Sequence, residues 1–315
     1  MYFPPEWHEQ AFVQLTWPSE HTDWRYMLDE ITTTYKQLQQ TIERFEPVFV
    51  VSESLCPIND TWARDHAFLT TIDNGRAQLH DFQFNGWGGK FEAQHDNAIS
   101  LNVLPQIEQR YAPSKADYID ELDFVLEGGS IEVDEQGNIL TTTSCLLNPN
   151  RNPNLTKTGI EKQLRQRLGA KDILWIDGVQ LLGDDTDGHI DTIARFAPGN
   201  TIIYNETADA NDPHYAMLQS LRQQLEAFGR QLIPLPMPAP IFDQDNQPLP
   251  ATYANFLILN GAVLLPTYRQ PDNDLLAAKQ LTKAFPGRQI VALDAVPLIQ
   301  QHGSIHCATM QFPKV

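Results

Sequence analysis

The fold is predicted from three neighbouring stretches: TGIEKQLRQRLG at residues 158–169, ILWI at 173–176 and DTIARFAPGN at 191–200. In the first stretch, Ile160, Leu164 and Leu168 recur every four residues, which indicates one apolar face of a helix. Thr158 and Glu161 match a capping box at its start. ILWI is a strand candidate, and Pro-Gly-Asn in the third stretch marks a hairpin turn. The predicted unit is therefore a helix, a strand and a β-hairpin.

The same order recurs five times with a period of about 60 residues, although the units share little identity. Further helices are predicted at residues 24–45, 96–110, 213–228 and 271–285, the second broken or kinked by Pro105. Strands are predicted at 48–51, 118–125, 232–235 and 290–293, and first hairpin strands at 67–72, 130–133 and 255–259. Residues 304–311 lack a partner downstream, so we expect them to pair with 11–16 at the other end of the chain.

Five such units in a ring predict an α/β fold, a five-fold pseudosymmetric α/β propeller sealed by its terminal strands. No Gly/Ser-rich linker divides the chain, so residues 1–315 are expected to form a single domain. The alternative is a doubly wound sheet in two domains. That fold predicts no hairpin after every helix and strand.

The net charge of −18 excludes the function classes that bind polyanions, namely nucleic-acid proteins and anionic-membrane proteins. No apolar run is long enough for a membrane helix, and the first residues lack a signal-peptide pattern. We therefore expect a cytoplasmic protein. The cysteines Cys56, Cys145 and Cys307 form no C-x-x-C pair, which argues against a disulfide framework and a cysteine zinc site.

Unusual polar residues occupy the same phase of each unit, between the strand and the hairpin. Asp65, Glu127 and His189 follow one another at steps of 62 residues. In a ring, equal phase means equal radius, so these side chains are expected to converge on one pocket. The whole set comprises Asp65, Glu127, His189, Asp191, Asn255 and Cys307.

A cluster of carboxylates needs a cation, and two carboxylates can grip both edges of a planar guanidinium. A thiolate above its carbon would be a nucleophile, and a histidine could move protons. The pattern thus predicts guanidine hydrolysis. His189 and Asp191 are two residues apart and share a face if they lie on a strand, whereas His306 and Cys307 are adjacent and face apart, so a structural role is expected for His306.

Ordinary interpretations of the same residues stay open. His189 is also consistent with a satisfied core histidine, Asp65 with an ion pair to Arg64, and Glu127 with a cap before the Gly-Gly turn. Cys56 and Cys145 are expected to take no part in the chemistry, because most single cysteines are small buried apolar residues.

Eight motifs in order over nearly the whole chain carry a resemblance to a known family. They are PEW at 5–7, LTWP at 15–18, WARD at 62–65, FNGWGGKF at 84–91, LEGGSIE at 126–132, NRNP at 150–153, GDDTDGHIDT at 183–192 and IHC at 305–307. The sequence resembles the agmatine deiminase branch of the guanidino-group-modifying enzymes, the bacterial peptidyl-arginine deiminase-like proteins. The resemblance implies the pentein fold, a five-fold pseudosymmetric α/β propeller.

The resemblance also implies a hydrolysis without metal or cofactor. Residues matching Asp65 and Asp191 bind the guanidinium, the residue matching Cys307 attacks its carbon, and the residue matching His189 moves protons. Glu127 matches the acid that orients the histidine or the guanidinium. A covalent amidino-cysteine intermediate would follow. The implied reaction converts agmatine and water to N-carbamoylputrescine and ammonia, a step of putrescine biosynthesis and polyamine metabolism.

The expected partner is a small cationic guanidino substrate, and a homodimer is compatible with the sequence. Asp185 is the candidate for the far amine of agmatine, Trp62 and Trp87 for its aliphatic stem, and Asn255 for a further substrate contact. The family usually has Gly-Gly-Gly-Asn before the cysteine; here the segment is QHGS at 301–304, near the expected substrate tail.

Other functions remain open from the sequence. The same chemistry on free or peptide-linked arginine would give citrulline. The acidic run 184–191 superficially fits a metal-dependent ureohydrolase, but that leaves Cys307 without a role. A non-catalytic polyamine or guanidine binder and an amidinotransferase are the remaining alternatives.

Overall fold

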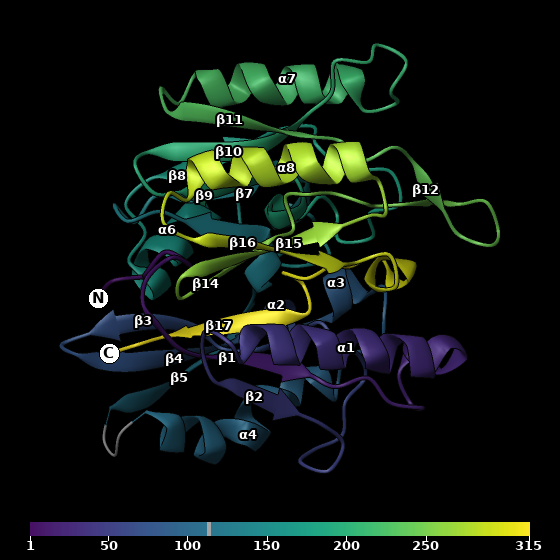
Figure 1. Ribbon diagram of the computed structural model, residues 1–315. Helices are drawn as coiled ribbons and strands as arrows, with labels where there is room; N and C mark the ends of the chain where they lie inside the picture. The colour runs from purple at the N-terminus through teal and green to yellow at the C-terminus, as the bar shows by residue number, and fades with distance from the viewer. Residues whose placement is uncertain (112–114) are drawn as a thin grey trace.

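The computed structural model describes residues 1–111 and 115–315 (Figure 1). In this part of the chain, most strands form five three-stranded sheets, each with one antiparallel and one parallel pair. In order within each sheet, they are β17 (Thr309–Pro313), β1 (Gln10–Thr16) and β2 (Val48–Val51); β3 (Leu69–Asp73), β4 (Arg76–Gln83) and β5 (Ala116–Val125); β6 (Ile131–Val133), β7 (Ile139–Thr142) and β8 (Ile173–Ile176); β9 (Ala194–Ala197), β10 (Thr201–Glu206) and β11 (Gln231–Pro236); β14 (Leu257–Leu259), β15 (Ala262–Thr267) and β16 (Gln289–Asp294).

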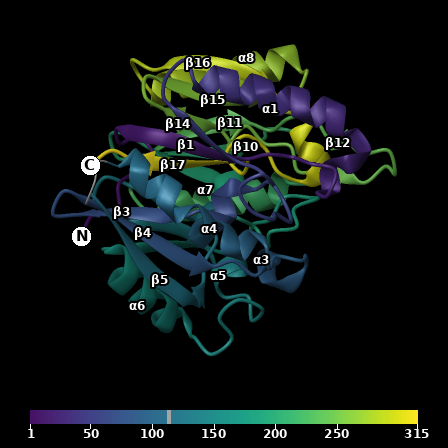
Figure 2. The ribbon, with the colours of Figure 1, turned by 90° about the horizontal axis from the view of Figure 1, so that it is seen from below.

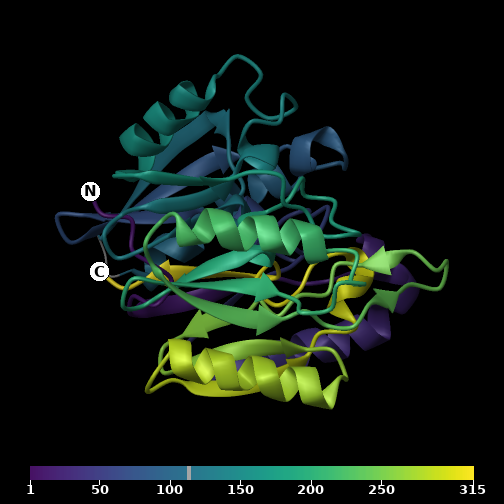
Figure 3. The ribbon, with the colours of Figure 1, turned by 90° about the horizontal axis from the view of Figure 1, so that it is seen from above.

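One long helix precedes the third strand of each sheet and makes the crossover that a parallel pair requires. These helices are α1 (Leu28–Ile42), α4 (Asp96–Arg110), α6 (Lys157–Leu168), α7 (Tyr215–Glu226) and α8 (Pro271–Ala284). Figures 1, 2 and 3 show them on the outside of the strands. Their buried side chains are mostly apolar and recur every three or four residues, so one face of each helix packs against its sheet.

Short elements join these units. They are α2 (Ala63–His66), α3 (Gly86–Gly89), α5 (Thr143–Leu146), η1 (Asp23–Met27), η2 (Gly128–Ser130), η3 (Ile190–Thr192), η4 (Leu298–Gln301) and the two-stranded hairpin of β12 (Ile241–Phe242) with β13 (Pro248–Leu249). The hairpin projects from the body in Figure 1. It is an element that the sequence patterns did not predict, because neither strand exceeds two residues.

The predicted repeat of helix, strand and hairpin is present, and β2 and β8 have the predicted bounds. The terminal strands pair as expected, with Leu15 opposite Thr309 and Val13 opposite Gln311. In the described part of the chain no strand pairing joins two of these sheets, so they form neither one continuous sheet nor a closed barrel. The alternative of a doubly wound sheet is therefore wrong.

Three local expectations are corrected. The N-cap of α6 is Thr156, whose hydroxyl accepts from the Gly159 N–H, so the capping box at Thr158 is not formed. Pro105 lies inside α4, which continues to Arg110 instead of breaking. Asp191 lies in η3 rather than on a strand, because β9 begins only at Ala194.

Among the described residues, the apolar core divides into three clusters, and β14 is fully buried along its length. Among the described residues, none of the helices combines the length and the hydrophobicity that spanning a bilayer requires.

Candidate active site

A cleft opens where turns from different units meet. Four carboxylates line it, and no arginine or lysine is among its described lining residues. The lining side chains are Asp23, Asp60, Trp62, Asp65, Trp87, Phe91, Asp185, Thr186, His189, Thr192, Gln301, His302, Gly303 and Cys307. A cleft with four carboxylates and no arginine or lysine in its described lining favours a positively charged ligand.

Cys307 lies on the turn that leads into β17, and its side chain is 7% exposed. Asn255 holds this turn: its amide oxygen accepts from the backbone N–H groups of His306 and Cys307, at 2.9 and 3.2 Å. Its amide nitrogen lies 3.2 Å from the Cys307 sulfur. The Arg64 N–H also donates to the Cys307 carbonyl. The nucleophile candidate is thus fixed from both sides.

Asp191 lies beneath Cys307 and is fully buried. Its Oδ2 accepts from His306 Nδ1 at 2.7 Å and from Asn255 Nδ2 at 3.2 Å, and lies 3.7 Å from the Cys307 sulfur. Its Oδ1 is buried and has no hydrogen-bond partner in the protein. A buried carboxylate oxygen without a partner is costly, so a ligand donor is expected there.

His189 is the N-cap residue of η3, with Nδ1 3.8 Å from Asp65 Oδ1. Neither of its ring nitrogens has a hydrogen-bond partner in the protein, and both are buried. Cys145 lies behind the ring: its sulfur, a Glu127 oxygen and a His189 nitrogen all lie within 4.8 Å of one another. Cys145 is therefore next to the site, contrary to expectation.

Asp65 and Gly129 show how tightly the site is built. Asp65 accepts from the Gly129 N–H at 2.8 Å and from Trp87 Nε1 at 2.9 Å. A Cβ at Gly129 would lie 2.7 Å from His189 Nδ1 and 2.9 Å from Asp65 Oδ1. Only glycine lets the backbone approach the two side chains this closely.

Glu127 is held by a residue that the sequence patterns did not identify. Arg151 Nε donates to both Glu127 oxygens at 2.9 Å, and its Nη1 donates to Asp187 at 2.7 Å. Lys90 also pairs with Asp187, at 2.7 Å. Arg151 comes from the NRNP motif, which therefore fixes the acid behind His189.

Burial and neighbouring charges set the protonation states. Burial and the carboxylates of Asp191 and Asp65 raise the pKa of Cys307 well above its usual value. Burial opposes the imidazolium of His189, yet the charge of Asp65 and the contact with Cys145 raise its pKa well above the usual value. Burial alone would raise the pKa of Asp191, but the hydrogen bond and charge of His306 lower it. An unliganded site with a thiol, an imidazolium and a carboxylate follows.

The structure brings the predicted residues together, but not all along the cleft. Asp65, Trp62, Trp87, Asp185, His189 and Cys307 line it. Glu127, Asp191 and Asn255 lie beneath or behind those residues and do not line it. Within the protein, Asn255 contacts Cys307 and Asp191, and its contact with substrate stays a prediction.

Asp60 and His302 also line the cleft and were not singled out by spacing. Burial and the nearby charge of Asp96 raise the pKa of Asp60 to about 8. His302 adopts a left-handed backbone, with φ of 65°, in the segment where the family usually has glycine. Two signals were available in the sequence: Asp60 is two residues before the WARD motif, and His302 departs from the glycine-rich pattern.

Two buried groups have metal-ligand atom types, but arginines already neutralise their acids. Arg151 pairs with Glu127 in the group Glu127, Cys145 and His189. Arg195 pairs with both acids in the group Glu6, Glu132 and His306. A divalent cation in either place would meet a guanidinium that cannot be deprotonated.

The acidic run also has other partners. Asp184 accepts from the backbone N–H groups of Thr186 and Gly188, at 3.1 and 2.7 Å, which shapes the loop. Asp187 pairs with Lys90 and Arg151. Asp184 and Asp187, two acids of the run that suggested a ureohydrolase, are therefore engaged within the protein.

The geometry suits attack on a guanidinium. A thiol, a histidine without partners and two carboxylates surround one point at the base of the cleft. One carboxylate can bind each edge of a planar cation, and the histidine can exchange protons with it.

Known proteins share this sequence and fold. The family model of Porphyromonas-type peptidyl-arginine deiminase matches residues 2–313. A Legionella pneumophila protein named "Putative agmatine deiminase" is 34% identical over 340 residues, which cover 99% of this chain and 95% of that protein.

Two solved structures illustrate the likeness. A cysteine-to-serine variant of C. jejuni agmatine deiminase with substrate bound has a TM-score of 0.91 and 37% identity, covering 98% of this chain and 95% of that one. The "Putative Arginine Deiminase" of Porphyromonas gingivalis has a TM-score of 0.92 and 43% identity, covering 99% and 98%. A dimethylarginine dimethylaminohydrolase, at 13% identity and a TM-score of 0.55, shares the fold alone. On this match along its whole length, the chain belongs to the Porphyromonas-type peptidyl-arginine deiminase family.

Proposed function

We propose that the chain is a hydrolase that deiminates agmatine to N-carbamoylputrescine and ammonia. The observation that carries the proposal is the surroundings of the Cys307 thiol, which lines the cleft together with His189 and lies 3.7 Å from Asp191 Oδ2. Asp191 Oδ1 and both ring nitrogens of His189 are buried without a partner in the protein. These buried polar groups would be satisfied by the N–H groups and the leaving nitrogen of a guanidinium.

In the proposed complex, Asp65 and Asp191 each accept hydrogen bonds from one edge of the guanidinium. Asp191 offers its free Oδ1, and Asp65 offers the remaining lone pairs of oxygens already held by Gly129 and Trp87. The bound cation lowers the free energy of the Cys307 thiolate, so the thiol loses its proton to solvent when substrate binds.

The proposed chemistry has two halves. The Cys307 sulfur attacks the guanidinium carbon, and His189 gives its proton to one amino group. Ammonia then departs, and a cationic amidino-cysteine remains. Neutral His189 then takes a proton from water as the oxygen bonds to the same carbon. The carbon–sulfur bond breaks, the hydroxyl proton is lost to the ammonia, and the ureido product forms. Glu127, held by Arg151, keeps His189 in place.

The lining of the cleft favours agmatine over arginine. Asp60, Asp185 and Asp23 lie toward the mouth, and no described lining residue is an arginine or lysine. A primary amine at the far end of the substrate would be attracted, whereas an α-carboxylate would meet like charges. Trp62 and Trp87 offer apolar walls to the four-carbon stem. The C. jejuni relative with bound substrate supports this choice.

Three broader expectations belong to the same proposal. We infer that the five sheets surround a pseudo-five-fold axis as in a propeller, supported by their identical pairing pattern and the terminal pair β1–β17. We infer one domain over residues 1–315, since the family model spans nearly all of it. A cytoplasmic location stays a prediction from the sequence.

The test is an assay for ureido product with agmatine, free arginine and a blocked arginyl peptide, each with and without EDTA. Turnover of agmatine alone that EDTA leaves unchanged is expected. Turnover of arginine or the peptide alone would keep the mechanism and replace the substrate. No product from any of the three would contradict the proposal.

A further inference from the structure

His306 makes contacts that an ordinary core histidine would not need. Its ring is 1% exposed and lies between two carboxylates, with Nδ1 2.7 Å from Asp191 Oδ2 and Nε2 2.7 Å from Glu6 Oε2. Each contact is a favourable hydrogen bond only if the ring nitrogen carries a proton. The contacts with the two carboxylates together favour a doubly protonated ring.

The surrounding charges agree with an imidazolium. The buried groups around the ring include the acids Glu6, Glu132 and Asp191 and the bases Arg64 and Arg195. With His306 cationic, three positive charges balance three negative ones, whereas a neutral ring would leave one buried negative charge in excess. Arg195 Nη2 donates to Glu6 Oε2 at 2.8 Å and also lies 2.9 Å from His306 Nε2, a contact that is a hydrogen bond only in a ring whose Nε2 is unprotonated.

We propose that His306 is a positioning residue for the deimination: as an imidazolium it links Asp191 to Glu6, which keeps Asp191 ionised and leaves its Oδ1 free for the guanidinium. The role rests on the proposed function. It departs from the structural role expected from the sequence, because the ring acts on the substrate through Asp191. It also brings the N-terminal segment into the catalytic apparatus.

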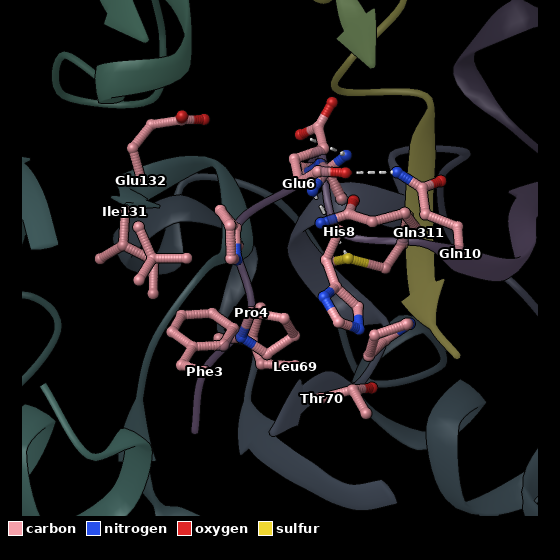
Figure 4. Close-up of a pocket in the computed structure, with 16 residues that line it drawn as sticks. Phe3, Pro4, Glu6, His8, Gln10, Leu69, Thr70, Ile131, Glu132 and Gln311 are labelled. Carbon is pink, nitrogen blue, oxygen red and sulfur yellow. Dashed lines mark hydrogen bonds and ion pairs between the residues drawn. The ribbon is translucent and has the colours of Figure 1, made fainter. Parts of the chain in front are cut away.

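Glu6 is fixed for this task by other parts of the chain. Its Oε1 accepts from the Ile258 N–H at 2.6 Å, and its carbonyl accepts from Gln10 Nε2 at 2.6 Å. It lines a second cavity (Figure 4), which shares no described lining residue with the catalytic cleft. The chain Glu6–His306–Asp191 therefore runs from this second cavity to the Cys307 thiol.

The contact has a direct electrostatic consequence. The hydrogen bond and charge of His306 are the main causes that hold the pKa of Asp191 below its usual value against burial. Without them, Asp191 would become protonated at higher pH and lose its attraction for a guanidinium. Removing an opposite charge at this distance typically shifts a carboxyl pKa by about 1–3 units.

The experiment compares His306→Asn and Glu6→Gln with wild type over the pH range of the agmatine assay. In His306→Asn the amide still reaches Asp191 but not Glu6, and the charge is lost. The acid limb of kcat/KM is expected to move to higher pH by about 1–3 units. Activity is expected to recover in part at high pH, and KM to rise more than kcat falls. Glu6→Gln is expected to move the limb in the same direction by less.

The matched control is His80→Asn. His80 is 2% exposed and also contacts a carboxylate and a hydroxyl, those of Glu121 and Thr71, but it lies outside the cleft. Its replacement is expected to leave the pH profile unchanged. A His306→Asn profile that is lowered equally at every pH would assign a purely structural role and overturn the proposal.

A second measurement does not depend on turnover. In ¹⁵N-histidine-labelled protein, the ring signal that is lost in His306→Asn is expected to show both nitrogens protonated. If His306→Asn does not fold, the signal that shifts in Glu6→Gln identifies the ring instead. One unprotonated ring nitrogen would refute the imidazolium. If wild type turned over no guanidino substrate, the proposed function and the positioning role would fail together, whereas the ring signal would still decide whether His306 is an imidazolium between the two carboxylates.

Discussion

The protein on the two sides of Asp191 differs in how its charged groups are paired. On the inner side, Glu6, Glu132, His306 and Arg195 form a closed set in which every acid has a basic partner. On the cleft side, four carboxylates share the lining with no arginine or lysine in the described part. Buried ion pairs help to maintain the fold, whereas buried polar atoms without a partner indicate where a ligand binds.

The largest effect is expected at the cleft side. Cys307→Ser should lower kcat by about 10⁴-fold or more, because a hydroxyl is a far weaker nucleophile at neutral pH. The fold should persist, since the two side chains are similar in size. Ureido formation and thermal unfolding by circular dichroism measure the two properties. Activity above a trace would show that the nucleophile is assigned wrongly.

The inner side should respond in stability. Arg195→Met leaves Glu6 and Glu132 buried without their guanidinium and should lower the free energy of unfolding by about 3–5 kcal/mol. Urea denaturation measures this change. The control is Arg222→Met, whose ion pairs are exposed, and it should change stability far less. Equal losses in the two variants would remove the distinction between the inner pairs and surface pairs.

Substitution of Asp60 tests whether the cleft binds the primary amine of agmatine in addition to its guanidinium. Above pH 8, where Asp60 is ionised, Asp60→Asn removes one charge contact and should raise KM for agmatine by about tenfold, while KM for butylguanidine stays unchanged. The pKa of Asp60 is raised to about 8, so its charge is lost as pH falls through that value. In wild type, KM for agmatine should therefore fall as pH rises towards 8, because the primary amine stays protonated. A pH-independent KM would rule out this contact.

His302 provides a smaller test at the mouth of the cleft. Its φ of 65° strains a side chain with a Cβ, and its Nδ1 donates to the Gly183 carbonyl at 2.7 Å. His302→Gly loses the hydrogen bond but relieves the strain, whereas His302→Ala loses the bond and keeps the strain. The free energy of unfolding of His302→Gly, measured by urea denaturation, should exceed that of His302→Ala by about 1 kcal/mol. The opposite order would mean that the backbone is not strained there.

The smallest expected effect on activity distinguishes Cys145 from Cys56, for which the sequence predicted the same absence of a catalytic role. Cys145→Ala removes a contact of His189 and should lower kcat by about two- to tenfold, with the alkaline limb moved to lower pH as the pKa of His189 falls. Cys56 does not line the cleft, so Cys56→Ala should leave the pH profile of activity unchanged. Matching profiles for the two variants would show that Cys145 does not act on His189.

Much of the fold was predictable because its signals are local. Apolar periodicity and turn residues mark each helix and strand, and β2 and β8 begin and end as predicted. The errors are local as well. The start of α6 depended on which of two threonines caps it, and the strand expected from Asp191 begins only at Ala194, after a 3₁₀ turn. A side-chain hydrogen bond to the backbone decides such points, and spacing does not record it.

The candidate site was predictable where a residue belongs to a recurring phase or a family motif. Asp65, His189, Asp191 and Cys307 meet as that phase required. Arg151 and Glu6 were not assigned roles, although both lie in motifs that carried the resemblance. Their roles depend on which distant carboxylate or ring each side chain reaches.

By itself the sequence determined the repeated unit, the pairing of the chain ends, the nucleophile candidate and the acids around it. Tertiary structure alone decided that Glu6 contacts a ring 300 positions away, that Cys145 touches His189 and not the solvent, and that Asn255 holds a turn behind the cleft. The physical reason is the distance along the chain over which each interaction acts. Periodicity and capping act within a few residues, whereas burial, charge balance and the completion of hydrogen bonds depend on neighbours that only the folded chain brings together.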